Sequence, residues 1–434
     1  MTLPEDFIRE TRLLMGEDRF NRFLGAFDEE APTSIRINRR KVDGGNHNSP
    51  LGSPLATEGT QEFSILNSQF EKVPWCPEGF YLSGRPQFTF DPLFHAGCYY
   101  VQEAASMFIT HVLRSLSNLI PHSSFLIPRN VLDLCAAPGG KSTAMRTVLP
   151  EGSVLVSNEP IPTRAQILLE NITKWDWPDC IVTNNYPLDF RKAKMTFDLI
   201  LCDVPCSGEG MFRKDPATIS EWSLQNVEKC WRLQREIVAD AWECLNPGGL
   251  LIYSTCTFNI KENEENIRWI LDTYDAEALT IPTDPSWNIT GSLLPGFDVP
   301  VYRFIPGITR SEGLFMCALR KFGGTEVRGY GGARYDYRQI KGLSILVPPF
   351  PRTPVPPTID LSYPDALRYL RGEALILPPD TPRGIVTVTY RGIPLGPVKN
   401  IGSRANNLYP KPWRIKTTHL PSEPVEIINM LKSE

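Results

Sequence analysis

Apolar strand-like runs alternate with helix-like runs between residues 130 and 321, and this alternation constrains the fold more than any other feature. Helical patterns, including RAQILLENITKW and a long stretch over residues 218–245, separate the strand-like runs. Those runs are VLDL (131–134), SVLVSNEP (153–160), DLILCDV (198–204) and GLLIYST (249–255). Strands that alternate with helices form βαβ units with parallel strands. We therefore predict an α/β core with a mostly parallel sheet, which we place at residues 96–321.

The segment before this core has a different pattern. Residues 4–27 carry apolar side chains near helical spacing, which predicts one or two amphipathic helices, and residues 34–42 have the pattern of a strand. A Gly/Asn/Ser/Pro-rich interval at 44–60 predicts a loop. Residues 99–116 show the pattern of a helix that leads into the core. We expect an N-terminal α+β unit at residues 1–95.

The last third of the chain predicts a separate small unit. Residues 301–321 have a turn-rich centre between two apolar halves, as in an antiparallel hairpin that closes the core. A connecting segment follows at 322–358, and six of its last twelve residues are prolines, which predicts an extended strap or linker. Residues 359–434 form the final unit, in which 384–396 alternate as a β-hairpin.

Charge is distributed unevenly along the chain. The net charge is −4, but from Lys321 onward 16 Lys and Arg stand against 9 Asp and Glu, so the last quarter is about +7 and the rest about −11. A basic C-terminal unit has the sign needed to hold a polyanion such as RNA. No run of eighteen apolar residues and no signal peptide is found, so we expect a cytoplasmic protein without a membrane partner.

The ten cysteines lack the spacing of a small disulfide-bonded domain, which favours reduced thiols. Cys202 and Cys206 have the spacing of half a metal site, but the five histidines lie far from them in sequence. We therefore expect no metal ion.

A glycine-containing loop, CAAPGGK, follows the strand at 131–134 and precedes a helix. Small residues there let the backbone approach a ligand, and helix N-terminal amides face it. Glu159 ends the next strand, 20 residues after Gly139, where a carboxylate can hold ribose hydroxyls. The loop lacks the length of a phosphate-binding loop, so it favours an adenosyl compound. An ordinary strand-to-helix turn with a solvated Glu159 is the alternative.

Two further cysteines, Cys206 and Cys256, follow two of the strand-like runs. Ligands of α/β sheets bind outside the carboxyl ends of the strands, so thiols there are placed for chemistry. A thiolate is a nucleophile, and two thiols suggest covalent catalysis on an electron-poor ring. Asp203, three positions before Cys206, could hydrogen-bond such a ring. The alternative is that both cysteines are small buried hydrophobes, as we expect for most of the other cysteines.

Three segments, DLCAAPGGKS, DVPCSGEGMFRKDP and YSTCTFNIKENEEN, resemble motifs of the NOL1/NOP2/Sun family of RNA cytosine-5 methyltransferases. The resemblance extends over about the first 320 residues. It implies a Rossmann-like, S-adenosylmethionine-dependent core in which Cys256 attacks cytosine C6 and Cys206 is needed for product release. It implies that Lys141 also orients the base and that Asp203 lines the pocket. The residues implied in cofactor binding are Cys135, Ala136, Ala137, Pro138, Gly139, Gly140, Lys141, Glu159 and Asp203.

The sequence departs from the family pattern at one position. Where the family often has an aspartate near the adenine, TNNYPLDF has Tyr186, with Asp189 three residues later. Either Asp189 substitutes for that aspartate, or the contact is made differently.

The N-terminal INRRK and YVQEAASM segments and the basic tail are most similar to the bacterial branch that methylates small-subunit (16S) ribosomal RNA and carries a C-terminal PUA-like domain. The implied partner is this RNA, free or within the small ribosomal subunit. The basic and aromatic tail suits phosphate contact and base stacking. Its candidate RNA-binding residues are Lys399, Arg404, Lys411, Trp413 and Arg414. Three alternatives stay open: a tRNA substrate, a ribosome-assembly factor that binds RNA without turnover, and a solvated basic face on a stability domain.

Overall fold

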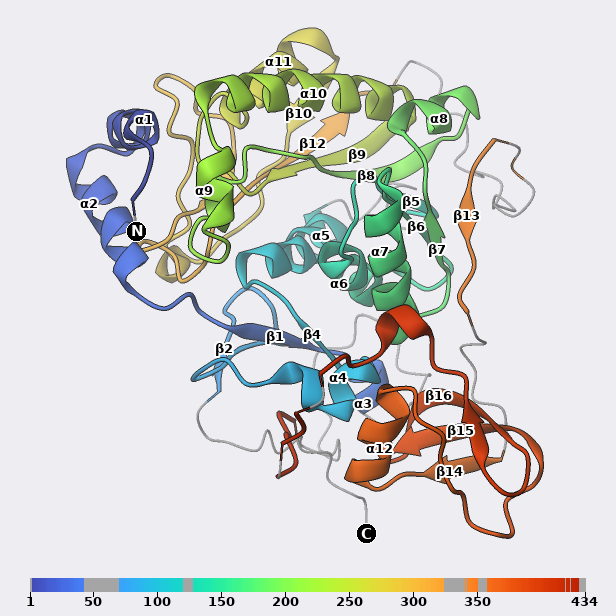
Figure 1. Cartoon of the computed structure of the whole chain (residues 1–434). Coiled ribbons are helices and arrows are strands. Elements are labelled where there is room, and N and C mark those ends of the chain that lie inside the picture. The colour runs from blue at the N-terminus through green and yellow to red at the C-terminus, as the bar shows by residue number, and fades with distance from the viewer. Residues whose placement is uncertain are drawn as a thin grey trace.

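A computed structural model describes residues 2–42, 70–119, 128–323, 340, 342–349, 357–417, 419–421 and 423–428. Three sheets organise this part of the chain, one centred in each of the three units that the sequence predicts (Figure 1). An edge strand of the core sheet, at Ile345–Leu346, comes from the segment predicted as a connection. The expected loop at 44–60 and residues 350–356 of the proline-rich segment lie outside the described residues. Within the described residues, no helix is both long and apolar enough to cross a membrane.

The N-terminal unit begins with two amphipathic helices, as predicted: α1 (Glu5–Met15) and α2 (Glu17–Gly25). Acidic residues in the first turn of each helix suit the positive end of the helix dipole. A four-stranded antiparallel sheet follows, in the order β2 (Glu71–Lys72), β3 (Gly79–Tyr81), β1 (Ser34–Ile37) and β4 (Tyr99–Val101). Since β4 belongs to this sheet, the sheet extends past the boundary expected at residue 95.

Two predictions for this unit are wrong in part. The strand expected over 34–42 ends at Ile37, and α3 (Arg39–Val42) is a helical turn, because the Asn38 side chain leaves the strand and donates to carbonyl oxygens of Gly97 and Trp175. The helix expected over 99–116 begins only at Phe108. Tyr99–Val101 pairs with β1 instead, so its backbone hydrogen bonds go to a neighbouring strand, and the 3₁₀ turn η3 (Ala105–Met107) leads into α5 (Phe108–Leu119).

The core contains a nine-stranded sheet with the order β10-β12-β9-β8-β5-β6-β7-β13, with β11 paired to β12. Strands β5 to β9 are parallel, and β12 runs antiparallel to β9. The antiparallel pair of β11 and β12 is the hairpin predicted over residues 301–321. The strands are β5 (Asn130–Asp133), β6 (Val154–Asn158), β7 (Cys180–Thr183), β8 (Phe197–Asp203), β9 (Leu245–Thr255), β10 (Ala276–Ala278), β11 (Tyr302–Phe304), β12 (Leu314–Lys321) and β13 (Ile345–Leu346).

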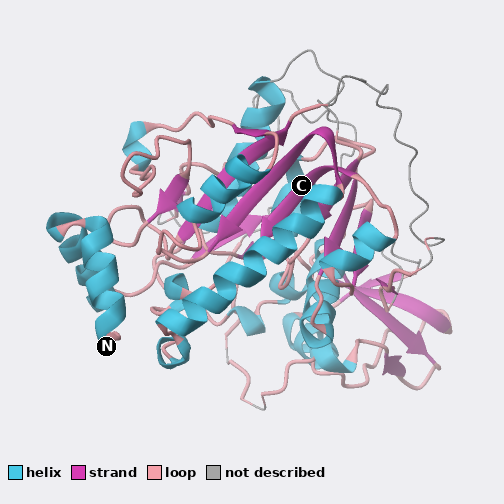
Figure 2. Ribbon diagram, turned by 90° about the horizontal axis from the view of Figure 1, so that it is seen from above, coloured by secondary structure: helices cyan, strands magenta, loops and turns pink. Residues whose placement is uncertain are grey.

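Helices cover both faces of this sheet (Figure 2). Alternate strand residues face opposite layers: Leu199 and Leu201 pack in the cluster that includes α5, whereas Ile200 and Cys202 pack in the cluster that includes α10. The core helices are α5, α6 (Gly140–Val148), α7 (Pro162–Trp175), α8 (Pro187–Lys192), α9 (Ala217–Glu221), α10 (Leu224–Glu243) and α11 (Glu264–Thr273).

The helix expected over 218–245 is divided. It consists of α9 and α10, separated at Trp222 and Ser223. Ser223 has extended backbone, and its hydroxyl accepts the Asn226 N–H at 3.1 Å as the N-cap of α10. The Trp222 indole N–H donates to Glu209, which fixes the break close to the end of β8.

The C-terminal unit is a second small α+β unit. Its four-stranded sheet has the order β14 (Thr358–Asp360), β15 (Gly384–Tyr390), β16 (Ile393–Asn400) and β17 (Ala405–Asn407), and β15 and β16 form the predicted hairpin. Its helix α12 (Tyr363–Leu370) packs near α4 (Pro92–His95) of the N-terminal unit. The two units share one hydrophobic cluster, to which Ile35 and Leu367 both belong. The N- and C-terminal units therefore support each other although they are far apart in sequence (Figure 1).

Candidate active site

The structure brings Cys206 and Cys256 together at the carboxyl ends of two neighbouring parallel strands. In the β8–β9 pairing, Asp203 lies beside Ser254, so the loops that follow these strands leave the sheet side by side. The Sγ atoms of Cys206 and Cys256 are 3.3 Å apart. Both cysteines are partly exposed, whereas Cys202, four residues before Cys206, is buried. Two thiols in contact at the carboxyl ends of strands can share one proton. Side chains that only fill space in the core do not need such a contact.

A buried hydrogen-bond network holds the two cysteine loops against each other. The hydroxyls of Ser207 and Thr257, the residues after each cysteine, are 2.9 Å apart. The Glu209 carboxylate accepts the backbone N–H groups of Phe258 and Asn259, and the Asn259 amide donates to Glu209 Oε1 at 3.0 Å. Because these contacts join one loop to the other, they fix the separation of the thiols.

The Glu262 carboxylate accepts hydrogen bonds that hold the Cys206 loop in place. It is fully buried, and its Oε2 accepts the Ser207 N–H at 3.0 Å and the Gln234 amide at 2.7 Å. Its Oε1 accepts the Asn259 amide at 2.8 Å. Burial, together with the charge of Glu209, raises the pKa of Glu262 to about 7 in spite of these hydrogen bonds. Sequence analysis did not single out this residue, which lies within the IKENEEN stretch.

The two cysteines have different charged neighbours. Lys141 Nζ donates to Asp203 Oδ2 at 2.9 Å. Burial is the largest influence on the pKa of Lys141 and lowers it. The charge of Asp203, its hydrogen bond to Lys141 and the charge of Cys256 together outweigh burial, so this pKa is raised and the ammonium stays protonated. The hydrogen bond with Cys256, followed by burial, raises the pKa of the Cys206 thiol well above its usual value, and Glu262 adds to this shift.

The glycine loop lies at the carboxyl end of β5, one strand away from Asp203. Gly139 has φ +112°, a conformation that side chains avoid, and it caps α6. Cys135 and Ala136 are buried and Pro138 is exposed, while Ala137, Gly140 and Lys141 are half-buried. The Ala136 N–H donates to Asn158, so the loop is bound to the end of β6. The loop therefore lies beside the carboxyl ends of β5 and β6.

Two buried carboxylates next to this loop fit an adenosyl cofactor. Glu159 is buried, and its Oε1 accepts the Ile161 N–H at 3.1 Å. Its Oε2 has no hydrogen bond within the described residues and lies 3.5 Å from an Arg164 guanidinium nitrogen. Burial raises the pKa of Asp133 to about 7, and Asp133 Oδ1 likewise has no hydrogen-bond partner in the described part of the chain. Ribose hydroxyls or a ligand ammonium group would satisfy such oxygens.

Arg36 of the N-terminal unit reaches beneath the glycine loop, which sequence reasoning missed. It is 1% exposed, and its guanidinium donates to Thr143 Oγ1 at 2.6 Å and to the Gly140 carbonyl oxygen at 3.4 Å. It also donates to Gln102 Oε1 at 2.8 Å and stacks 4.3 Å from the Trp175 ring. Residues 34–42 are basic, but only the fold shows that one of their arginines, Arg36, turns inward.

The structure also places the TNNYPLDF segment, which departs from the family pattern. Asp189 Oδ2 accepts the Tyr186 N–H at 2.9 Å, so this carboxylate caps α8. The Tyr186 side chain is 67% exposed at the end of β7.

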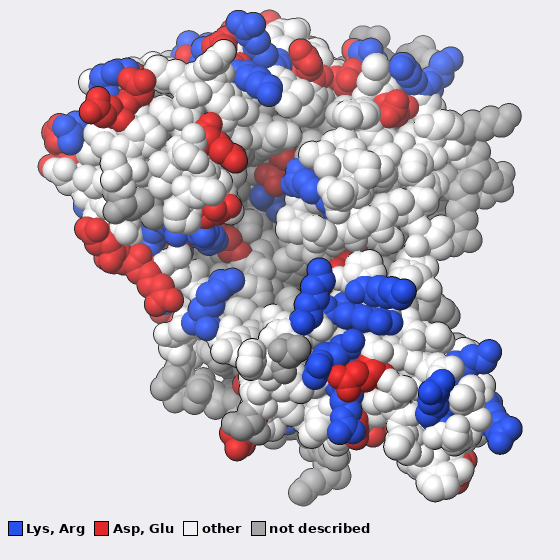
Figure 3. Space-filling view, in the orientation of Figure 1, with Lys and Arg blue, Asp and Glu red and all other residues white. Residues whose placement is uncertain are grey.

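The five candidate RNA-binding residues divide into two groups. Lys399, Arg404 and Lys411 are exposed, and basic side chains gather over the C-terminal unit below the hollowed centre of the molecule (Figure 3). Trp413 is buried in the hydrophobic cluster that includes Tyr409, which does not fit the base-stacking role expected of it. Arg414 donates to the Tyr409 carbonyl oxygen and lies against Gly372. Trp413 and Arg414 therefore stabilise the unit in this structure.

Comparison with known proteins identifies the relatives of all three units. Residues 125–320 match the model of 16S rRNA methyltransferase RsmB/F, residues 3–104 that of the N-terminal domain of 16S rRNA methyltransferase RsmF, and residues 356–415 that of the methyltransferase RsmF PUA domain. Among the described residues, no group of three or more His, Cys, Asp or Glu is arranged to hold a metal ion.

Curated relatives carry the name ribosomal RNA small subunit methyltransferase F. The protein of Salmonella agona is 31% identical over 355 residues, which cover 79% of this chain and 69% of the relative. That of Serratia proteamaculans is 32% identical over 329 residues, 74% of this chain and 63% of the relative. The chain thus spans just under two thirds of the length of some of these relatives.

Solved structures share the fold. A methyltransferase homolog protein from Pyrococcus horikoshii has a TM-score of 0.55 and 26% identity, and the match covers 74% of this chain and all of that one. NSun6 from the same organism has a TM-score of 0.55 at 19% identity, over 74% of this chain and 99% of that one, which supports the fold alone.

Proposed function

Because the chain belongs to the RsmB/F family of S-adenosylmethionine-dependent 16S rRNA methyltransferases, with the RsmF N-terminal and PUA domains, we propose that it methylates C5 of a cytosine in small-subunit ribosomal RNA. In this proposal Cys256 forms a transient bond to C6 of the base, and Cys206 assists release of the product. The single observation that carries it is the contact of these two thiols beside the Lys141–Asp203 ion pair.

The charges around the pair support the division of roles. A thiolate is the attacking form of cysteine, and a nearby cation favours it. Lys141 interacts with the charge of Cys256, whereas the hydrogen bond that the Cys206 thiol donates to Cys256 and the charge of Glu262 favour the protonated form of Cys206. These neighbours support Cys256 as the attacking cysteine and Cys206 as the cysteine that assists release.

The proposed steps balance in bonds and protons. Attack by the Cys256 thiolate forms a bond to C6 and moves an electron pair to C5, which becomes nucleophilic. After C5 has gained its methyl group, a base removes the C5 proton, the C5–C6 double bond returns and the Cys256 sulfur leaves as a thiolate. Cys206 lies next to that sulfur and is placed to assist this last step.

Asp203 and Lys141 would orient the base. Asp203 Oδ2 is paired with Lys141, and the Asp203 side chain stays 29% exposed, so it can accept a hydrogen bond from the exocyclic amine of cytosine. A base must leave its stack to reach this edge of the sheet, so an unpaired or flipped cytosine is expected.

S-adenosylmethionine, when bound, would supply the methyl group. The residues of this chain that would hold it are Glu159, whose buried oxygen suits ribose hydroxyls, and the glycine loop from Cys135 to Lys141. Asp133 and Asp203 would line the same pocket. The exposed Lys399, Arg404 and Lys411 of the PUA domain would contact RNA phosphates. Since its substrate is ribosomal RNA, we expect the protein to act in the cytoplasm.

Bisulfite sequencing of total RNA from a strain that lacks the gene tests this proposal. Loss of one 16S cytosine mark, restored by the wild-type gene and not by Cys256→Ala, is the expected result. Loss of a tRNA mark would show that the substrate is tRNA. If no mark is lost, the result would favour a ribosome-assembly factor that binds RNA without turnover.

A further inference from the structure

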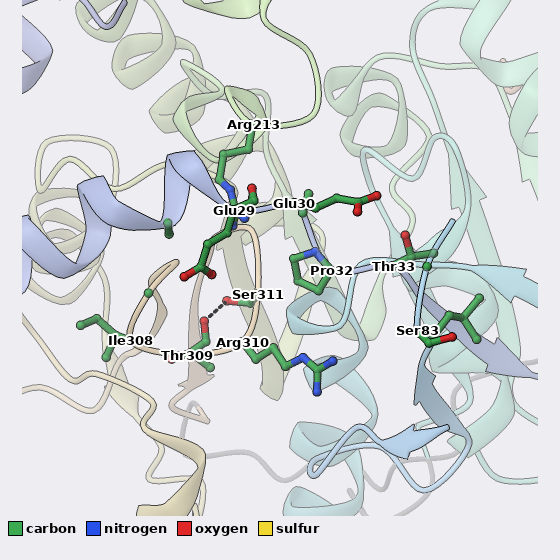
Figure 4. Close-up of a pocket in the computed structure, with 15 residues that line it drawn as sticks. Glu29, Glu30, Pro32, Thr33, Ser83, Arg213, Ile308, Thr309, Arg310 and Ser311 are labelled. Atoms are coloured by element: carbon green, nitrogen blue, oxygen red, sulfur yellow. Dashed lines mark hydrogen bonds between the residues drawn. The ribbon is translucent and has the colours of Figure 1, made fainter. Parts of the chain in front are cut away.

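A cavity that neither Cys206 nor Cys256 lines lies where the N-terminal unit meets the core. Its volume is about 450 Å³. Its walls come from the connection between η1 (Ala26–Asp28) and β1, the turn after β3 and the turn at 307–311, with Arg213 added by the loop after η5 (Glu209–Met211). Figure 4 shows Glu29 and Arg213 towards one end, Thr33 and Ser83 towards the other, and Arg310 along one side. The adduct chemistry proposed above uses none of these residues.

Short backbone contacts connect this cavity to the reactive cysteine. The Gly210 N–H donates to the Cys256 carbonyl oxygen at 2.7 Å, and a Cβ at Gly210 would lie only 2.6 Å from that oxygen and 3.1 Å from the Glu312 carbonyl oxygen. Three residues later, the 7% exposed Arg213 side chain donates to Glu312 Oε1 at 2.9 Å and to the Glu29 carbonyl oxygen at 3.1 Å. The cavity wall and the Cys256 backbone are thus parts of one packed assembly.

The turn at 307–311 is held in place before any ligand binds. Gly307 has φ +76°, and a Cβ there would lie 2.2 Å from the Arg22 carbonyl oxygen, so α2 is seated directly on the turn. The Tyr81 hydroxyl donates to the Arg310 carbonyl oxygen at 2.7 Å, and the Arg310 guanidinium lies 4.1 Å from the centre of the Tyr81 ring. A preformed site avoids most of the ordering cost of binding.

The walls carry groups of both charge signs, which narrows the class of ligand. Arg310 is half-exposed and pairs with Glu71, while Glu29 and Glu30 are exposed carboxylates. Two carboxylates at the cavity disfavour a bare phosphate. A nucleotide fits better, because its phosphate can meet a guanidinium while an exocyclic amine of its base donates to a carboxylate. The volume is within the range of small-ligand sites.

We propose that this cavity binds a nucleotide of the RNA close to the target cytosine, with Arg310 contacting its phosphate and Glu30 accepting a hydrogen bond from the exocyclic amine of its base. This inference rests on the proposed function, because it takes the RNA to be held with one cytosine at Cys256. It makes the cavity a determinant of sequence context, in which guanine, adenine or cytosine is accepted and uracil, which has no exocyclic amine, is disfavoured.

Kinetics of three full-length variants test the proposal. Arg310→Ala and Glu30→Ala remove the two contacts, and Ser83→Trp fills the cavity while keeping both charges. Each is expected to raise the KM for 16S RNA isolated from the deletion strain by about tenfold, the effect of losing one charge-assisted contact. The kcat at saturating RNA and the KM for S-adenosylmethionine should not change. Arg9→Ala, an exposed arginine on α1 with acidic partners, is the matched control. An unchanged RNA KM in all three variants would overturn the proposal.

A crosslinking experiment gives a readout that does not depend on turnover. A benzophenone amino acid at position 83 is expected to crosslink 16S RNA within a few nucleotides of the cytosine trapped on Cys206→Ala, whereas the same label at Leu13, 76% exposed on α1, should not. A crosslink only at distant nucleotides contradicts the inference. If wild-type protein instead fails to methylate any RNA, the proposed function fails, and the presence or absence of a crosslink from position 83 still shows whether the cavity contacts RNA.

Replacement of the neighbouring nucleotides by uridine, one at a time in a synthetic RNA, tests base preference. We expect one position at which uridine lowers kcat/KM for the wild-type protein and has no effect on Glu30→Ala. A loss of the same size in both proteins would remove Glu30 from base recognition.

Discussion

The Sγ atoms of Cys206 and Cys256 lie 3.3 Å apart although 50 positions separate the two residues in sequence. Parallel pairing of β8 and β9 creates this contact, because both strands deliver their carboxyl ends to the same edge. We predict that Cys206→Ala, which keeps the nucleophile, accumulates a covalent protein–RNA adduct on denaturing gels. Cys256→Ala should abolish methyl transfer and leave no adduct. The reverse pattern would exchange the two roles.

The Lys141–Asp203 ion pair predicts the reactivity of the site. Replacing Lys141 by methionine removes the cation that interacts with Cys256, so alkylation of Cys256 by iodoacetamide at pH 7 should slow by about tenfold, as loss of one nearby charge implies. Lys141→Arg should retain most of the wild-type rate. Labelled peptides from Cys206→Ala protein, in which Cys256 is the remaining thiol of the pair, provide the measurement. Equal alkylation rates for the methionine variant and the parent would contradict the assigned role.

Glu262 predicts how stability depends on pH. Its pKa in the folded protein, about 7, is above the value of about 4.3 expected for an unfolded chain, so the folded state binds the proton more tightly. The corresponding stability is present below the unfolded value and is lost as pH rises through about 7, on the order of 3 kcal/mol. The free energy of unfolding in urea should therefore fall less between pH 5 and pH 8 for Glu262→Gln than for the wild type. Identical pH slopes would show that Glu262 is ionised throughout.

The buried hydrogen bonds of Arg36 connect the N-terminal unit to the glycine loop, so a change at Arg36 should affect both stability and cofactor binding. Arg36→Met would leave Gln102 and Thr143 without their buried donor, which should cost about 1–3 kcal/mol in unfolding free energy. Because the Gly140 carbonyl oxygen loses the same partner, the Kd for S-adenosylmethionine should rise as well. Arg39→Met, in the neighbouring α3, is the control. Isothermal titration calorimetry with S-adenosylmethionine distinguishes this link from a purely structural role, which would leave the Kd unchanged.

In the PUA domain, we expect different residues to account for stability and for RNA binding. Trp413→Ala should destabilise the protein by about 3–5 kcal/mol, because it empties a site in the shared hydrophobic cluster. Combined replacement of Lys399, Arg404 and Lys411 by alanine should instead leave the melting temperature nearly unchanged and lower RNA affinity. The dependence of that affinity on salt should become shallower, since fewer phosphates are neutralised. Filter binding at several salt concentrations and thermal denaturation measure the two effects, and an unchanged salt slope would place the RNA contacts elsewhere.

Local pattern predicted much of the core. The apolar runs became β5, β6, β8 and β9, and the glycine loop and both cysteines emerged at strand ends because the period and direction of parallel strands dictate where their ends meet. The same reasoning failed over residues 99–116, where Tyr99–Val101 found a partner strand in β1 that no local signal identifies. It also failed at residue 222, where the Trp222 contact with Glu209 accompanies the break in an otherwise continuous helical pattern.

The sequence by itself determined the α/β core, the glycine loop and the pair of thiols, since each depends on residue types within a short stretch of chain. Tertiary structure alone decided that Arg36 supports Gly140 from 104 residues away, that Trp413 is buried instead of available to RNA, and that a cavity forms beside Arg213. These features arise where separate segments pack together. Their free energy comes from shared burial and buried hydrogen bonds, and no periodicity in the chain encodes which distant residues will meet.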